Sequence, residues 1–195
     1  EHAQVQFRSR HPDVQITTVW HGVQLLPQIP VEGEPFADFY RKRLGNADAM
    51  TMRQTQVQQA ASAVGLAIDL TRIETMPNTA DAHRLFERAS ALGNASQREM
   101  LLERLFAAYF LRRENLGCRE TLLAIARSCG IATDGLLDCL MGDATPFAGP
   151  PGATSGVPSF QFDGRMTVIG AQPAQALLGA MNEALKESER ERQPA

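Results

Sequence analysis

Apolar and polar positions along the chain predict mostly helices, with short strands near its two ends. Residues 3–11 fit the end of a helix, and residues 14–20 alternate and are rich in β-branched side chains, a pattern typical of a strand. Residues 24–35 contain three prolines and a glycine and predict an irregular loop. Apolar residues then recur at helical spacing, and we expect a short helix from Pro35 and further helices over residues 48–64, 80–92, 100–113, 119–129 and 134–141.

The ends of these helices carry recognisable capping residues. Asn78 and Thr79 are suited to cap the helix that Gly93 ends, and Ser96 and Glu99 have the spacing of a capping box for the next helix. We therefore expect a block of capped, amphipathic helices in the middle of the chain.

The C-terminal part predicts a hairpin followed by one helix. Two short strands, residues 159–162 and 165–169, flank Asp163-Gly164, a pair that accepts the positive φ angles of a tight hairpin turn. Pro173 starts an amphipathic helix, and we expect the charged residues 188–195 to form a fraying tail. Three strands make a thin sheet, which helices must cover, so an α/β or α+β layer is implied.

Composition excludes several classes of protein. The 195 residues include 19 Lys and Arg against 22 Asp and Glu, a net charge of −3, so we expect no nucleic-acid partner. No apolar run approaches the roughly 20 residues that span a bilayer, and no signal peptide is visible. We expect no membrane partner and a cytoplasmic location.

The three cysteines, Cys118, Cys129 and Cys139, are spaced by eleven and ten residues. Their odd number and the lack of a Cys-x-x-Cys pair or a nearby His argue against a disulfide framework and against a metal site. We expect small apolar residues on helix faces. Cys118, which precedes a helix, comes nearest to a redox position, but no partner lies within three residues of it.

Pro158 in Gly156-Val157-Pro158-Ser159-Phe160 stands at the mouth of the first hairpin strand. A proline cannot donate to a strand ladder, so it belongs at the first residue of a strand. Because an X–Pro bond prefers trans by only about 0.5–1 kcal/mol, we expect the Val157–Pro158 bond to be cis and to face a groove.

Several segments together resemble a known family. They are the Pro-rich loop around Pro27 and Pro30, the Asn-Thr-x-x-Ala-His-Arg run that starts at Asn78, and Val157-Pro158-Ser159-Phe160 with its Asp-Gly hairpin. This combination resembles the FrnE-like group of the DsbA family, in which a helical domain is inserted into a thioredoxin fold. The resemblance implies an α/β, thioredoxin-like fold made of residues 1–34 and 146–187, with an inserted helical domain over residues 35–145.

The family pattern begins with a strand that leads into Cys-Pro-Trp-Cys, and this segment is not in the sequence. Residues 3–11 look like the remainder of the helix that follows it, so the resemblance places the nucleophilic cysteine upstream of Glu1. The stretch between Asp143 and Gly156 is also shorter than the family usually shows. The function implied is that of a protein thiol–disulfide oxidoreductase that needs no cofactor.

The resemblance also suggests four substrate-binding residues. Val157 and Pro158 would face the active cysteines, and Asn78 and His83 would lie where the helical domain meets the thioredoxin domain. Read without the family, Asn78 is a helix cap, His83 is a partly exposed helix residue and Pro158 is a strand-entry proline. The partner implied is a protein or small molecule that carries a thiol or disulfide, and a homodimer stays open.

Two alternatives remain on the same scaffold. One is a glutathione-dependent isomerase or transferase related to 2-hydroxychromene-2-carboxylate isomerase, in which a Ser replaces the Cys and glutathione is the cofactor. The other is a non-catalytic binding module. The upstream residue distinguishes the first alternative from the oxidoreductase.

Overall fold

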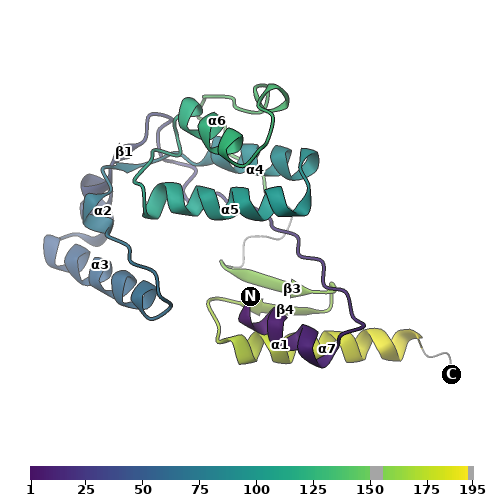
Figure 1. The fold of residues 1–195 in the computed structure, drawn as a ribbon. Coiled ribbons are helices and arrows are strands. Elements are labelled where there is room, and N and C mark those ends of the chain that lie inside the picture. The colour runs from purple at the N-terminus through teal and green to yellow at the C-terminus, as the bar shows by residue number, and fades with distance from the viewer. Residues whose placement is uncertain (150–155, 193–195) are drawn as a thin grey trace. The chain divides into compact units, whose positions relative to one another are not determined.

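The computed structural model describes residues 1–149 and 156–192, which pack as two compact units (Figure 1). The described parts of Glu1–His21 and Gly149–Ala195 form one, here called the terminal unit, and Gly22–Ala148 form the helical unit. Each unit has its own apolar core, as expected when an insertion folds as a separate body.

The terminal unit is a hairpin with two helices. Its elements are α1 (His2–Arg10), β3 (Ser159–Phe162), β4 (Met166–Ile169) and α7 (Ala174–Arg192). β3 and β4 pair antiparallel from Ser159–Ile169 to Phe162–Met166. α1 lies against α7 (Figure 1), and their buried side chains, Ala3, Phe7, Leu178 and Met181, form the core of this unit.

The hairpin prediction is confirmed. Asp163 and Gly164 have φ angles of 52° and 70°, the left-handed values that this pair was expected to supply. Arg165 N–H donates to the Phe162 carbonyl at 3.0 Å and closes the turn.

Two predictions for the terminal unit are wrong. Residues 14–20 form no strand, because among the described residues no strand pairs with them, and an alternating sequence needs a hydrogen-bonded neighbour to become part of a sheet. Val14 and Ile16 still pack on the core of the unit, whereas Trp20 is 50% exposed. Residues 188–192, which were expected to fray, belong to α7, which ends at Arg192. They stay helical because Ser188 is buried, with 6% exposure.

The helical unit consists of helices joined by short turns. In chain order it contains β1 (Glu34–Pro35), α2 (Phe36–Leu44), α3 (Ala47–Ser62), the 3₁₀ turn η1 (Leu70–Arg72), β2 (Thr75–Met76), α4 (Ala80–Leu92), α5 (Ala95–Phe110), α6 (Arg119–Ser128) and the 3₁₀ turn η2 (Asp134–Leu136). β1 and β2 form a short antiparallel pair. The helices expected over residues 48–64, 80–92 and 119–129 are present with ends within two residues of the prediction. The helix expected over 100–113 is α5, which begins five residues earlier and ends three residues earlier, and residues 134–141 form only the turn η2.

The helical unit has two apolar clusters. The larger lies among α4, α5 and α6, and its innermost side chains, Leu85, Leu101, Leu122, Ile125 and Leu136, are fully buried. The smaller surrounds Ile29, Phe36 and Phe39. Because Ile29 is 2% exposed in this second cluster, residues 22–34 pack with the helical unit and not with the thioredoxin-like part to which the sequence assigned them. The units divide after His21 and after Ala148, where residues 34/35 and 145/146 were predicted.

The capping box of α5 lies two residues earlier than predicted. Asn94 Oδ1 accepts from Gln97 N–H at 2.9 Å, and Gln97 Oε1 accepts from Asn94 N–H at 3.1 Å. Gln97 Nε2 also donates to the Gly130 carbonyl at 2.7 Å. Gln97 thus caps α5 and joins it to the end of α6, a second bond that the Ser96–Glu99 spacing gave no means to foresee.

Candidate functional site

Val157 and Pro158 lie in the terminal unit, directly before β3. The peptide bond between them, expected to be cis, is cis in the structure. Both residues are exposed, and the Pro158 carbonyl accepts from Gly170 N–H at 2.7 Å. Among the described residues no hydrogen bond reaches the backbone N–H or C=O of Val157. This segment therefore offers free backbone groups beside the start of a strand.

Gly156 shapes the approach to this segment. Its φ angle is +126°, a region that side-chain-bearing residues avoid, and a Cβ there would lie 3.2 Å from Ile169 Cγ2. The glycine thus sets the backbone direction just before Val157.

Asn78 lies in the helical unit, immediately before α4, and is 5% exposed. Its Oδ1 accepts from Ala80 N–H at 2.9 Å and from Gln24 Nε2 at 3.2 Å, and its Nδ2 donates to the Ile29 carbonyl at 2.7 Å. An amide side chain can make about four hydrogen bonds, and three are used here. Asn78 therefore bonds the N–H of Ala80, the first residue of α4, and fixes the Pro-rich loop to this helix, whose N-cap residue is Thr79.

His83 lies in the first turns of α4. Its ring stacks on Phe147 with centroids 5.1 Å apart and 21° between the planes. Burial lowers the pKa of His83 below its ordinary value of 6.5. Within the part of the chain that the structure describes, its ring nitrogens have no hydrogen-bond partner. Burial thus favours the neutral form of the His83 ring.

Gly22 is required by the same histidine. A Cβ at Gly22 would lie 2.5 Å from His83 Nδ1, so a side chain there would displace the ring.

Gln24 Oε1 accepts from Phe147 N–H at 2.7 Å while its Nε2 donates to Asn78. We call Gln24, Asn78, His83, Arg84 and Phe147 the α4 cluster.

Arg84 joins the α4 cluster to the segment that follows η2. It forms a buried ion pair with Asp81 at 2.6 Å, with side-chain exposures of 9% and 12%, and its guanidinium donates to the Thr145 carbonyl. Asp81 accepts from the backbone N–H groups of Met141 and Gly142 at 3.0 and 2.8 Å. These bonds hold residues 141–147, including the ring against which His83 stacks.

Sequence reasoning missed Gln24, Asp81 and Phe147. Asp81 and Arg84 have the i, i+3 spacing of a helical ion pair, so this contact was readable from the sequence. Gln24 and Phe147 are more than one hundred residues apart and carry no local signal of their contact.

None of the three cysteines has the surroundings of an activated nucleophile. Cys129 is buried and Cys118 and Cys139 are partly buried, and all are free thiols. Cys118 precedes α6, but its Sγ donates to Glu120 at 3.1 Å, and this bond lowers the pKa of the Glu120 carboxyl. Burial raises the pKa of the Cys139 thiol. The thiolate that disulfide exchange needs is disfavoured at Cys139, and the Cys118 thiol is held as a donor.

The chain matches one family model. Residues 2–146 match the DSBA-like thioredoxin domain, which is most of the chain. The chain belongs to this family. As the sequence analysis expected, it is a DsbA-family protein with an α/β, thioredoxin-like fold and a helical insertion. The family is one of thiol–disulfide oxidoreductases.

A solved structure agrees with this fold. The DsbA-like chain is similar to the crystal structure of a probable DsbA oxidoreductase from Streptomyces coelicolor, with 23% identity and a TM-score of 0.74. The similarity covers 99% of this chain and 86% of the other. No curated protein matches the sequence.

In residues 1–149 and 156–192 no group of three or more His, Cys, Asp and Glu side chains could hold a metal ion. No helix in the same ranges combines the length and apolar character needed to cross a bilayer.

Proposed function

We propose that this chain is part of a protein thiol–disulfide oxidoreductase of the DsbA/FrnE type. Its nucleophilic cysteine would belong to a Cys-x-x-Cys segment upstream of Glu1. Membership of the DsbA-like family supports the class of reaction. The free thiols at Cys118, Cys129 and Cys139 support a nucleophile from outside the printed residues, because none of them has a second thiol within three residues.

The observation that carries the proposal is the exposed backbone of Val157 ahead of β3, whose N–H and C=O have no hydrogen-bond partner among the described residues. An extended substrate segment can pair with this N–H and C=O in the manner of an added strand. Pro158 has no N–H of its own that would compete for the substrate. Val157 and Pro158 are therefore the proposed substrate-binding residues of the terminal unit.

His83 and Asn78 are the proposed contributions of the helical unit. Burial favours the neutral ring of His83, so its unprotonated nitrogen can accept the proton of an attacking thiol. Asn78 would act by holding the segment that carries Gln24 and by bonding the N–H of Ala80 in α4, since three of its hydrogen bonds are already made within the protein.

The proposed reaction is thiol–disulfide exchange. The thiolate of the first upstream cysteine attacks one sulfur of a substrate disulfide, a mixed disulfide forms, and the other substrate sulfur leaves as a thiolate. The second upstream cysteine then attacks the mixed disulfide, which releases the second substrate thiol and leaves the enzyme cysteines joined. Two electrons pass from the enzyme dithiol to the substrate, and the reverse sequence oxidises a dithiol.

The test uses the protein expressed from its natural start. We expect an upstream Cys-x-x-Cys pair, reduction of insulin disulfides above the uncatalysed rate, and loss of that activity when the first upstream cysteine is replaced by Ser. A protein with no upstream Cys-x-x-Cys would contradict the proposal. So would a protein whose cysteines are present but whose rate equals the background.

The same experiment separates the glutathione-dependent alternative. The scarcity of suitable thiols in the chain is also compatible with an enzyme that uses the thiol of bound glutathione and carries Ser at the upstream position. A serine there would favour the isomerase or transferase, whereas retention on glutathione resin that survives substitution of Val157 would count against it. A protein without either residue and without activity would be a binding module.

A further inference from the structure

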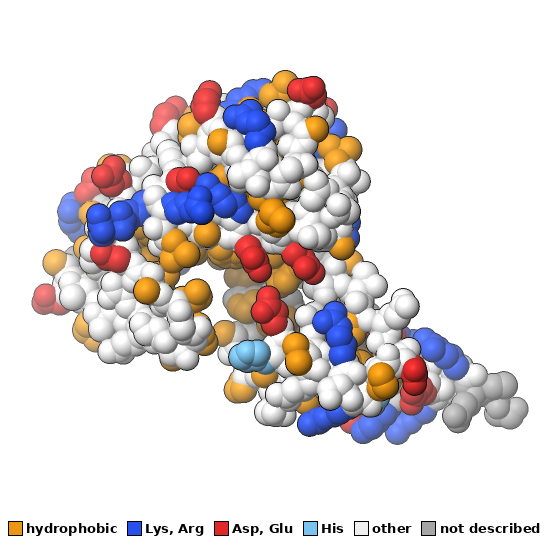
Figure 2. Space-filling model, viewed as in Figure 1, with side chains coloured by type: hydrophobic (Ala, Val, Ile, Leu, Met, Phe, Trp, Pro, Cys, Tyr) orange, Lys and Arg blue, Asp and Glu red, His pale blue; other side chains and the backbone are white. Residues whose placement is uncertain are grey.

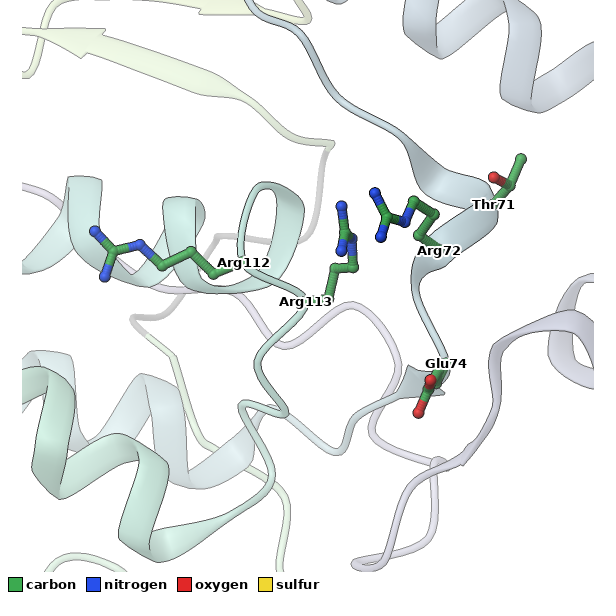
Figure 3. Close-up of a pocket in the computed structure, with 5 residues that line it drawn as sticks. All are labelled: Thr71, Arg72, Glu74, Arg112 and Arg113. Carbon is green, nitrogen blue, oxygen red and sulfur yellow. The ribbon is translucent and has the colours of Figure 1, made fainter.

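A cavity of about 450 Å³ lies in the helical unit and is formed by residues outside the α4 cluster. It is lined by Thr71, Arg72, Glu74, Arg112 and Arg113 (Figure 3). Its size falls in the range of small-molecule sites. Three guanidinium groups around one cavity make a site for an anion.

Two separate turns bring the arginines together. Arg72 is the last residue of η1, whereas Arg112 and Arg113 follow the end of α5. In Figure 3 the side chains of Arg72 and Arg113 extend toward the same space, whereas the side chain of Arg112 extends away from them. Glu74 lies on the segment that leads into β2. Figure 2 shows Lys and Arg side chains gathered over α2 and the neighbouring end of α5.

The arginines are not needed to cap α5. The Ala107 carbonyl accepts from the N–H groups of Leu111 and Arg112 at 3.0 and 2.9 Å, and the Ala108 carbonyl accepts from Glu114 N–H at 2.8 Å. Two of the last four carbonyls of the helix are thus bonded by backbone donors. The charges of Arg112 and Arg113 are free to act on something else.

Nearby carboxylates leave these arginines available. Glu114, the adjacent acid in the sequence, is held by Arg104 through two bonds of 2.6 and 2.9 Å. In residues 1–149 and 156–192, neither Arg72, Arg112 nor Arg113 forms an ion pair. Arg72, Arg112 and Arg113 therefore line the cavity without an ion pair to a carboxylate among the described residues.

Asp69 indicates how near two of these charges are to each other. Its pKa is lowered, first by the hydrogen bond from the Thr71 hydroxyl and also by the charges of Arg72 and Arg113. Asp69 Oδ1 accepts from Thr71 N–H and from the Thr71 hydroxyl at 3.0 and 2.6 Å, so this oxygen is already engaged. Both guanidinium groups act on one small region.

Arg113 occupies a backbone position where glycine is the usual residue. Its φ angle is 61°, one of two positive values among the described non-glycine residues. A side chain in this conformation is unfavourable in itself, and such positions are found where function requires the residue. Here an arginine stands where glycine would fit the turn after α5 more easily.

We propose that this cavity binds a small, soluble, phosphate-bearing molecule. Arginine presents paired N–H donors that match the oxygens of a phosphate, and its charge is retained at any physiological pH. Three arginines against Glu74 and Asp69 leave a net positive charge, which favours the roughly −1.5 to −2 charge that a phosphate monoester carries on one group over carboxylates, which carry one charge per group. Glu74 on the wall suits a ligand that also carries an amine. This site is independent of the proposed redox function.

The test is calorimetric titration of the protein with inorganic phosphate, with O-phosphoethanolamine and with succinate, at constant ionic strength. We expect saturable binding of both phosphate compounds at one site and weaker binding of succinate. Arg72→Gln should weaken phosphate binding about tenfold, the effect of losing one charged hydrogen-bond donor. Glu74→Gln should remove any preference for O-phosphoethanolamine over inorganic phosphate.

Two variants control for folding and for general charge. Arg113→Gly removes a guanidinium and places a residue suited to positive φ there, so it should weaken phosphate binding about tenfold without lowering the melting temperature. Arg53→Gln on α3 removes one exposed positive charge outside the cavity and should change phosphate affinity less than twofold.

Binding that does not saturate would overturn the proposal, as would equal weakening by Arg53→Gln and Arg72→Gln, or succinate binding as tight as phosphate. Vesicles that contain phosphatidylglycerol provide the last comparison. Co-sedimentation with these vesicles, without binding of the soluble phosphates, would replace the soluble ligand by a lipid surface and so contradict the assignment.

Discussion

Ion pairs of the same spacing differ in burial within this protein. Asp81–Arg84 and Asp38–Arg41 are both i, i+3 pairs on helices, at 2.6 and 2.7 Å. The first has side-chain exposures near one tenth, while the second has 66% and 45%. A partner lost from a buried pair leaves an uncompensated charge, whereas an exposed charge is solvated by water.

Asp81→Asn should lower the free energy of unfolding by about 3–5 kcal/mol, because Arg84 would be left buried without its partner. The loss also weakens the bonds that Asp81 accepts from Met141 and Gly142. The matched variant Asp38→Asn should cost about 0.5 kcal/mol or less. Urea denaturation of both variants measures the difference, and equal losses would contradict the importance given to this buried pair.

His83 gives a pH dependence of known sign. Its pKa is lower in the folded protein than in the unfolded chain because burial disfavours the charged ring. The stability that it contributes is present above the unfolded value near 6.5 and is lost as the pH falls through the folded pKa. We expect the difference in unfolding free energy between the wild type and His83→Gln to shrink as the pH falls from 7.5 to below the folded pKa of His83. Denaturation at several pH values measures this. A difference that does not change with pH would show that burial does not lower the pKa of His83.

Elements whose interacting residues lie close together in the sequence were predicted well. The helices of the central block bury residues at helical spacing, and the hairpin has both its strands and its turn within eleven residues. Residues 14–20 had the same quality of pattern as β3 but no local partner, and they form no strand. Alternation predicts which face of a strand is apolar, while the pairing that makes it a strand depends on residues elsewhere.

The capping of α5 provides a test at this scale. Asn94→Ala should lower stability by about 1 kcal/mol, since Asn94 accepts from the Gln97 N–H and its own N–H is capped in return. Ser96→Ala, at the position favoured by the sequence pattern, should change stability little. Thermal unfolding measures both losses. A larger loss from Ser96→Ala than from Asn94→Ala would show that Ser96, as the sequence pattern predicted, caps α5.

Substituting two glycines distinguishes the effect of turn geometry on stability from the effect of helix propensity. Gly164 has a φ angle of 70° in the hairpin turn, whereas Gly179 lies in α7 with open space around its Cβ position. Gly164→Ala should destabilise the protein by about 1–2 kcal/mol. Gly179→Ala should stabilise it by up to about 1 kcal/mol, because alanine is the better helix residue. Melting temperatures that move in the same direction for both variants would contradict this account.

At the scale of the whole molecule, the sequence predicted the fold family but placed the limits of the insertion imperfectly. Gln24 and Ile29 belong to the helical unit because they bond to and pack with residues around α4 and α2. The Pro-rich composition of this loop shows that it is irregular and gives no sign of the unit on which it packs. For the same reason the α4 cluster was predicted only through Asn78, His83 and Arg84, which share one short motif.

The central claim is that the reactive thiol of the proposed oxidoreductase is none of Cys118, Cys129 and Cys139. The most direct measurement is the insulin-reduction rate of the protein, expressed from its natural start, with these residues replaced as Cys118→Ser, Cys129→Ala and Cys139→Ser. We predict a rate within about twofold of the unmodified protein, because none of these thiols is placed for exchange. A triple variant that stays folded by circular dichroism but falls to the uncatalysed rate would contradict the account.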